Sequence, residues 1–289
     1  AELIKEKFQE YVINNPSIAQ NLEDKYNRTF NNYVVPNYSN GEQLTLPNSN
    51  DAIVLRSHQK RAVLRGILED RYLLDHVVGS GKTYTMCATI MERKRLGLNN
   101  KPMLVVPNHI VGQWRESFKS LYPNANVLCA DEKNFSKDKR ESFLSKMALN
   151  NWDCVIISHS AFEKISLNNE YVKTEIQKDL QSIEDILLSS DSRSFVTKQL
   201  KKVKEGYQSK LESMIKSENK DKVLHFDNLG VDELYIDEAH EYKNLQFHTK
   251  QGGISGINPK GSNKSYDLYM KCQYIQEQNK IRTGKNNKG

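Results

Sequence analysis

The amino-acid sequence predicts an α/β fold in which a parallel β-sheet carries helices on both faces. From about Leu55 onward, short apolar runs alternate with amphipathic helical segments. The runs are continuously apolar, which is typical of strands buried on both faces of a parallel sheet. A glycine-containing turn, Gly79–Thr83, also stands between a predicted strand and a predicted helix. Together these patterns indicate repeated strand–helix units.

The predicted elements follow one another in a regular order. The strands are Tyr72–Val77, Met103–Pro107, Asn126–Ala130, Cys154–Ser158 and Glu233–Ile236. The helices between the first four strands are Lys82–Leu96, His109–Leu121 and Lys137–Leu149. A further amphipathic helix, Tyr266–Gln278, lies among glycines near the end of the sequence.

The stretch between the last two predicted strands is too long for a simple crossover. It holds two apolar stripes at helical spacing, formed by Val172, Ile176, Leu180, Ile183 and Leu187, and by Val196, Leu200, Val203, Tyr207, Leu211 and Met214. The polar residues 189–192 between the stripes suit a turn followed by a helix start. We therefore expect an inserted antiparallel helical hairpin at about residues 166–222, with the stripes forming its packing seam.

Two regions are predicted along the chain. Residues 1–50 form an N-terminal extension with two helices, interrupted at Asn14–Ser17 and followed by a polar, turn-rich stretch. Residues 51–289 form the α/β lobe that contains the hairpin. The sequence begins with Ala1 rather than Met and ends in a polar, basic stretch, so we expect it to be part of a longer protein.

Composition excludes some classes of protein and leaves others open. The sequence has no apolar run long enough for a membrane helix, so no membrane partner is expected. Its four cysteines are far apart and show no zinc-site or disulfide spacing, which predicts a reduced, cytoplasmic protein. The net charge of +6 is compatible with a nucleic-acid partner but does not establish one.

The strongest local signal is a candidate phosphate-binding loop, Gly79-Ser80-Gly81-Lys82-Thr83. Two glycines let successive backbone N–H groups point at one anion, and the N-terminus of the following helix adds its dipole. Lys82 can reach terminal phosphates, and the Thr83 hydroxyl can bind Mg²⁺. The general pattern of such loops has glycine where this sequence has His76, which disfavours a small GTPase or a nucleotide kinase.

A second signal is a pair of adjacent acids at the end of the last predicted strand, in Asp237-Glu238-Ala239-His240. The carboxyl edge of a parallel sheet is where ligands bind, so the acids should lie near the loop. Asp237 would hold Mg²⁺, and Glu238 would orient or deprotonate an attacking water. A pair of solvated acids in a turn is the plainer alternative, but the apolar strand before them and the upstream loop make it the weaker one.

These motifs resemble the first RecA-like lobe of superfamily 2 helicases and translocases. Gly79–Thr83 is similar to their first motif, and Asp237–His240 is the DEAH form of their second. The segment Leu55–Val63 resembles their adenine-recognition segment, which implies that Gln59 contacts adenine. The resemblance also implies ATP and Mg²⁺ as cofactors and a role for His240 in coupling the nucleotide site to neighbouring motifs.

Two strand ends are similar to the family's nucleic-acid-contacting motifs. One contains Pro107 and Asn108, and the other contains Ser158 and His159. Backbone N–H groups at such loop-to-helix junctions can bind phosphate. The alternative is that Ser158 and Ser160 only cap a helix, and we expect Trp114 to serve core packing.

The segment Glu241–Leu245 resembles Swi/Snf-type translocases, and within them mobile-element and phage proteins that join a helicase to an adenine-N6 DNA methyltransferase. The resemblance implies double-stranded DNA, a second RecA-like lobe and a methyltransferase domain as partners. The Ser/Thr-Gly/Ala-Thr-Pro motif, the second lobe and the methyltransferase Asn/Asp-Pro-Pro-Tyr box do not occur in this sequence. We therefore expect weak nucleotide binding and negligible hydrolysis by these residues alone, because the partner lobe supplies the arginine finger.

Two functional hypotheses follow. The first is a DNA-dependent ATPase that moves along or remodels duplex DNA. The second is a scaffold that holds nucleotide or DNA and recruits partners through its hairpin. Basic runs such as Arg93-Lys94-Arg95 could face phosphates, although charge runs on helices are more often solvated.

Overall fold

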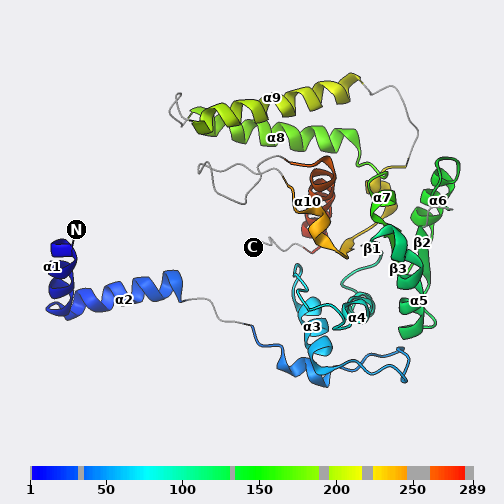
Figure 1. Ribbon diagram of the computed structural model, residues 1–289, viewed down its shortest axis with the longest axis horizontal. Coiled ribbons are helices and arrows are strands. Elements are labelled where there is room, and N and C mark those ends of the chain that lie inside the picture. Colours follow the sequence, from blue (N-terminus) through cyan, green and yellow to red (C-terminus); the bar gives the residue numbers. More distant parts are fainter. Residues whose placement is uncertain are drawn as a thin grey trace.

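A computed structural model describes residues 2–31, 36–130, 134–188, 195–216, 224–245 and 261–283 (Figure 1). Its centre is a sheet of four strands, β1 (Pro102–Val106), β2 (Val127–Ala130), β3 (Cys154–Ser158) and β4 (Glu233–Ile236). The strands run in the order β2-β3-β1-β4, and every pair is parallel. The predicted fold class is confirmed, and four of the five predicted strands lie within a residue of their predicted bounds.

The central strand β1 has apolar side chains on both faces. Met103 and Val105 belong to one buried cluster, whereas Leu104 and Val106 belong to another. The second cluster packs under α3 (Ser57–Leu68), α4 (Lys82–Arg95) and α5 (Val111–Leu121). The first packs under α6 (Lys137–Leu149), α7 (His159–Phe162) and α10 (Asn263–Thr283). Helices therefore cover both faces, as the continuous apolar runs predict.

The prediction of a strand at Tyr72–Val77 is wrong. The segment is extended but has no ladder partner among the described residues. A strand needs hydrogen bonds to a neighbour, and here alternate side chains stay in water, with Leu73 71% and Val77 80% exposed. The intervening side chains contact helices instead. The Tyr72 hydroxyl lies 3.5 Å from that of Thr89 on α4, and the His76 ring lies edge-on to that of His58 on α3.

The predicted hairpin is present as α8 (Asn169–Leu188) and α9 (Phe195–Lys216), which lie side by side (Figure 1). Ile176 and Ile183 of the first predicted stripe are buried, and an ion pair joins Lys204 to Glu184 at 2.8 Å. The predicted turn at residues 189–192 lies outside the described residues. Helix α10 contacts the hairpin: the hydroxyl of Tyr171 on α8 donates to Glu277 on α10 at 3.0 Å.

The N-terminal extension forms the two predicted helices, α1 (Glu2–Ile13) and α2 (Pro16–Phe30), which extend away from the sheet (Figure 1). Short 3₁₀ turns complete the fold at η1 (Ser39–Gln43), η2 (Asn108–Ile110), η3 (Phe226–Leu229) and η4 (Ala239–Tyr242). In the described parts of the chain, none of the helices has the length and apolar character that crossing a bilayer requires.

Two residues of the basic run 93–95 turn inward. Arg93 is buried and pairs with Glu233 at 2.6 Å. The Lys94 ammonium lies 3.2 Å from Asp153 and donates to the Asn100 carbonyl. Arg95 stays exposed and pairs with Glu92 of the same helix at 2.8 Å. Arg93 and Lys94 therefore connect α4 to the sheet and are not free to bind phosphate.

A buried lysine, Lys101, donates hydrogen bonds to carbonyls at the ends of α6 and η3. Its ammonium donates to the carbonyls of Met147 and Ala148, both at 2.9 Å, and of Leu229 at 3.1 Å. Burial lowers the pKa of this amine, although Asp232 opposes the change. The lysine thus replaces the missing donors at the C-terminus of α6 and in η3.

We expect Lys101→Met to lower the free energy of unfolding by about 2–4 kcal/mol, because three carbonyls lose their donor while the side-chain volume is kept. Urea unfolding would measure the loss. Lys164→Met, at an exposed lysine, is the matched control and should change stability by less than about 0.5 kcal/mol. Equal stability of the two variants would contradict this role for Lys101.

Candidate nucleotide-binding site

The glycine loop connects the extended segment 72–77 to the N-terminus of α4. Gly79 and Gly81 adopt φ angles of +78° and +85°, in the left-handed region that favours glycine. A Cβ on Gly81 would also collide with the side-chain amide of Gln59. The two glycines are therefore required by the backbone path, which curls the loop over the first turn of α4.

Lys82 begins α4 and points back into the loop. Its ammonium donates to the carbonyls of His76 at 2.8 Å and Val77 at 3.3 Å. The ammonium thus lies within the curve of the loop, beside the uncapped N–H groups of the helix start. Ser80 and Thr83 follow the same curve and are half-buried. A cation, a helix N-terminus and left-handed glycines are the features from which anion-binding loops are built.

Gln59 holds the loop against α3. Its amide nitrogen donates to the Gly81 carbonyl at 3.0 Å, and its amide oxygen accepts from the Arg56 backbone N–H at 2.9 Å. His58, one residue earlier, places Nε2 3.0 Å from the Ser80 carbonyl. The adenine contact implied for Gln59 stays a prediction. The contacts in the structure give this residue a structural role in shaping the loop.

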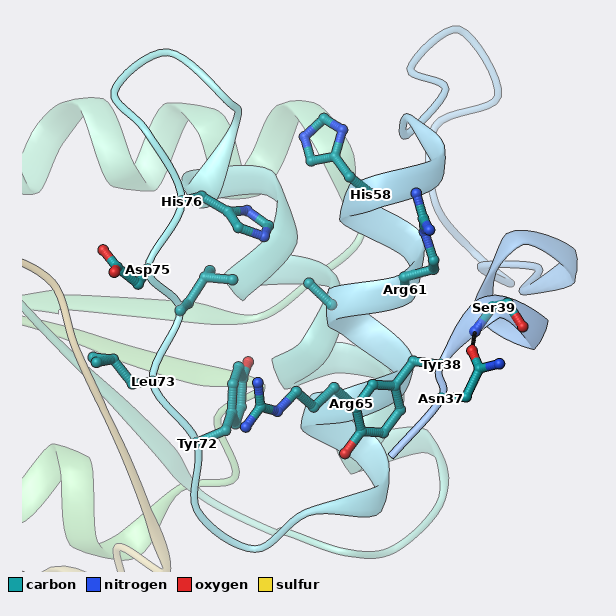
Figure 2. Close-up of a pocket in the computed structure, with 12 residues that line it drawn as sticks. Asn37, Tyr38, Ser39, His58, Arg61, Arg65, Tyr72, Leu73, Asp75 and His76 are labelled. Carbon is teal, nitrogen blue, oxygen red and sulfur yellow. Dashed lines mark hydrogen bonds between the residues drawn. The ribbon is translucent and has the colours of Figure 1, made fainter. Parts of the chain in front are cut away.

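His76 occupies the position where the general loop pattern has glycine. Its ring lies 5.4 Å from that of His58 in an edge-on arrangement. Burial lowers the pKa of His76, and the nearby His58 and Lys82 lower it further, while Asp75 opposes them. Figure 2 shows the imidazole directed toward α3, away from the curve of the loop. The His76 side chain therefore does not fill the space within the loop.

A cavity of about 430 Å³ opens beside the loop, between α3 and the segment 72–76 (Figure 2). Its wall includes Tyr38, His58, Arg65, Tyr72 and His76. The Arg65 guanidinium lies 5.8 Å from the centre of the Tyr38 ring. Aromatic faces combined with guanidinium groups suit a flat, polar ligand group. No single sequence motif predicts this cavity, because its wall combines three segments that are separate along the chain.

Asp237 directly follows β4 and is held on three sides. Its backbone N–H donates to the Val105 carbonyl at 2.9 Å, which extends the β1–β4 ladder. Its carboxylate accepts from the Trp114 indole N–H at 3.1 Å and from the Glu238 N–H at 3.1 Å. Burial raises the pKa of this carboxyl, and Lys82 is among the groups that lower it. That the loop and the acid pair act together stays a prediction.

Glu238 has a non-glycine backbone in the left-handed region, with φ of +54°. Such a conformation costs energy and is commonly found at functional sites. The bend leaves the Glu238 side chain about half exposed, with its carboxylate 3.1 Å from Nδ1 of His240. The second acid therefore projects from the sheet edge into solvent, whereas the first is tied to the core.

The other two strand ends lie next to the acid pair. Asn108 follows β1, and its side-chain oxygen accepts from the Ser160 N–H at 3.2 Å. Ser158 caps α7 by accepting from the Ala161 N–H at 3.2 Å. The capping alternative for Ser158 is therefore what the structure shows. Pro107 is half-buried and Asn108 is exposed, so the β1 end remains the more accessible part of this edge.

His159 is buried behind the strand ends rather than presented to solvent. Its Nε2 lies 3.0 Å from the Asp237 carbonyl, and its ring packs 5.3 Å from that of Tyr242. Its contact with nucleic acid stays a prediction. In the structure the His159 ring points inward. Trp114 belongs to the core, as expected, and additionally donates to Asp237. The one sequence signal for this hydrogen bond is the position of Trp114 in the first turn of α5, the helix that follows the β1 end.

The two predicted metal ligands match the preferences of Mg²⁺. Asp237 supplies carboxylate oxygens and Thr83 a hydroxyl, both hard oxygen ligands. The described residues contain no cluster of three or more acidic, His or Cys side chains that could bind a metal. Mg²⁺ is commonly held by one or two protein oxygens together with phosphate oxygens and water, so this donor set fits it.

A glycine loop at the N-terminus of a helix, together with an acid pair that follows a strand of a parallel sheet, is typical of P-loop nucleotide-binding domains. A family described as a probable helicase domain matches residues 68–286, which is most of the sequence. The chain therefore belongs to this helicase-domain family.

Other comparisons add less. No curated protein matches the chain. A solved structure described as the Sulfolobus solfataricus SWI2/SNF2 ATPase core in complex with dsDNA is similar at 18% identity and a TM-score of 0.34. The likeness covers 42% of this chain and 24% of that chain, so it spans about a quarter of the solved protein. A likeness at this TM-score supports no functional conclusion.

Proposed function

We propose that this chain is the ATP-binding lobe of a DNA-dependent ATPase of the helicase or translocase type. The observation that carries the proposal is the glycine loop: the Lys82 ammonium lies within the curve of a left-handed glycine turn at the start of α4. The anchored Asp237 carboxylate at the end of β4 supports it. Membership of a helicase-domain family supports the same class of activity. The subgroup, the second lobe and the linked methyltransferase domain belong to this proposal as well.

Each residue of the site has a separate task in phosphoryl transfer to water. The loop N–H groups and Lys82 bind the β- and γ-phosphates, and Thr83 and Asp237 hold Mg²⁺. The metal neutralises charge that develops on the phosphates. Glu238, exposed at the bend, orients or deprotonates the attacking water. The cavity between α3 and residues 72–76 would receive the base, and a second lobe would supply the arginine finger.

The DNA-binding part of the proposal rests on the start of α5. The N-cap residue of α5 is Ile110, whose side chain has no hydrogen-bond acceptor, and Gly112 and Gln113 in the first turn are exposed. A helix start of this kind offers backbone N–H groups to a phosphate. In α7, by contrast, Ser158 and Asn108 already accept from the first N–H groups. The β1 end is therefore the better candidate for the DNA backbone.

Gly112→Asp tests this surface, because it places a negative charge at the start of α5, where nothing crowds a new Cβ. The charge favours the helix but repels phosphate. We expect duplex DNA to bind about three- to tenfold more weakly at low salt, with thermal stability equal to or above that of the unmodified protein. Fluorescence anisotropy of a labelled duplex over a salt series would measure both affinity and salt dependence.

The matched control is Gly112→Ala, which adds a side chain without charge and should bind DNA like the unmodified protein. Affinity of the unmodified protein should fall steeply as salt rises. A flat salt response, or equal affinities of the Asp and Ala variants, would contradict this DNA surface.

A further inference from the structure

Asp237 is anchored by two side chains that come from neighbouring strand ends. Trp114 donates to its carboxylate at 3.1 Å, and His159 contacts its carbonyl oxygen at 3.0 Å. Trp114 lies on α5, which starts just beyond the β1 end, and His159 is the first residue of α7, which starts at the β3 end. Both the side chain and the main chain of one acid are therefore tied to the strand ends beside it.

Trp114 is well suited to fix the carboxylate. Its side chain is 3% exposed and packs in the core under α5, so the indole cannot turn away. The indole N–H can only donate, and it bonds one particular oxygen, Oδ2. The second oxygen accepts from the Glu238 N–H. The carboxylate is therefore held in one rotational position, with lone pairs left for a metal.

His159 is fixed by a stack of side chains that reaches α10. Its ring is 6% exposed and lies 5.3 Å from the ring of Tyr242. The Lys264 ammonium lies 4.7 Å from the centre of that Tyr242 ring. Lys264 also pairs with Glu163 at 3.5 Å and with Glu241 at 3.4 Å. The imidazole is thus held by the segment after the acid pair as well as by α7.

The two strand ends are joined to each other by the hydrogen bond from the Ser160 N–H to Asn108. A displacement at either end therefore reaches Asp237 through a single side-chain contact. We propose that Trp114 and His159 are positioning residues that set the metal-binding geometry of Asp237 and make it respond to DNA at the strand ends. This inference rests on the proposed function, because it assumes that Asp237 holds the metal of a bound nucleotide.

Fluorine NMR gives a direct readout, because the chain has two tryptophans. The 289-residue chain would be labelled with 5-fluorotryptophan, and Trp152→Phe would assign the two resonances. Trp152 donates to the Lys146 carbonyl at 3.2 Å. It precedes β3, whereas Asp237 follows β4, so it lies at the opposite edge of the parallel sheet and serves as an internal control. We expect Mg²⁺ with ATP, and separately duplex DNA, to shift the Trp114 resonance and leave Trp152 unmoved. Nucleotide binding without a Trp114 shift would overturn the inference.

Substitutions separate positioning from simple structural support. Trp114→Phe and His159→Leu each remove one hydrogen-bond donor and leave an apolar side chain in its place. We expect each to weaken ATP binding in Mg²⁺ by about tenfold, because loss of one hydrogen bond frees either the carboxylate or the main chain of Asp237 to move. Binding of ATP in EDTA should stay unchanged. His159→Gln keeps a donor near the position of Nε2 and should restore affinity to within about twofold of the unmodified protein.

The outcomes are distinguishable. If the unmodified chain binds no nucleotide, the proposed function fails and this inference fails with it. If the unmodified chain binds and the variants keep its Mg²⁺ dependence, only the inference is overturned. Equal losses in Mg²⁺ and in EDTA, or no rescue by His159→Gln, would show general structural damage and would also overturn it.

Discussion

Replacing Lys82 by Ala should abolish most of the stabilisation that Mg²⁺ and ATP give to this protein. The Lys82 ammonium lies in the curve of the glycine loop, where it donates to the carbonyls of His76 and Val77. On binding, the same donors would serve the phosphates. Two charge-assisted hydrogen bonds, each contributing about 1.5–3 kcal/mol, correspond to at least a hundredfold in affinity.

Thermal unfolding would measure this loss. At a nucleotide concentration of about 100 times Kd, binding stabilises the folded state by about 2.7 kcal/mol, and a hundredfold weaker variant keeps only about 0.4 kcal/mol. For a chain of this size, the expected rise in Tm falls from about 5 °C to about 1 °C.

Lys94→Ala is the matched control for Lys82→Ala. Lys94 is also on α4, but its ammonium bonds the Asn100 carbonyl and Asp153 at the other end of the helix. The Lys94 variant should lower the Tm without nucleotide and keep the full nucleotide-induced rise. An undiminished rise in the Lys82 variant would contradict the loop as the phosphate site.

Replacing Glu238 by Gln should stop hydrolysis and leave nucleotide binding intact. The Glu238 side chain is about half exposed at a left-handed bend, so Gln fits the same space and conformation. Gln cannot accept a proton from water, and general-base catalysis typically contributes 10²–10⁴-fold. In a protein that carries both lobes, we expect DNA-stimulated ATP turnover to fall by about 10³-fold.

A coupled ATPase assay together with nucleotide titration would test the Glu238 variant. Glu241→Gln is its control, since Glu241 is also an exposed acid in the same turn but pairs with Lys264 at 3.4 Å. The Glu241 variant should retain most turnover. Normal turnover by the Glu238 variant, or loss of its nucleotide binding, would contradict the assigned role.

Much of the architecture follows from local patterns in the sequence. The strands β3 and β4 and the helix α6 have the predicted bounds, because their apolar runs are bounded by polar residues. The hairpin was predictable from two stripes at helical spacing, which had to pack against each other. The structure of the segment Tyr72–Val77 was not predictable in this way. An apolar run indicates burial, but it does not show whether a neighbouring strand is present to pair with it.

The site was predictable where chemistry depends on adjacent residues. The glycine loop and the acid pair are each formed by adjacent residues, so the residue types alone predict a phosphate-binding loop and a metal-binding acid. The contacts that cross the fold were not predictable. Trp114 and Asp237 are far apart in the sequence, and an indole in an amphipathic helix gives the same signal whether or not its N–H meets a carboxylate. Ser158 and His159 were predicted from a strand-end pattern, but that pattern does not specify which way each side chain points.

A crystal structure of the chain with Mg²⁺ and a non-hydrolysable ATP analogue would test the central claim most directly. We predict the β- and γ-phosphates within the loop Gly79–Thr83, contacted by Lys82, and the metal between the Thr83 hydroxyl and the Asp237 carboxylate. The base should lie in the cavity between α3 and residues 72–76. Nucleotide bound away from the loop, or a metal that Asp237 does not approach, would contradict the account.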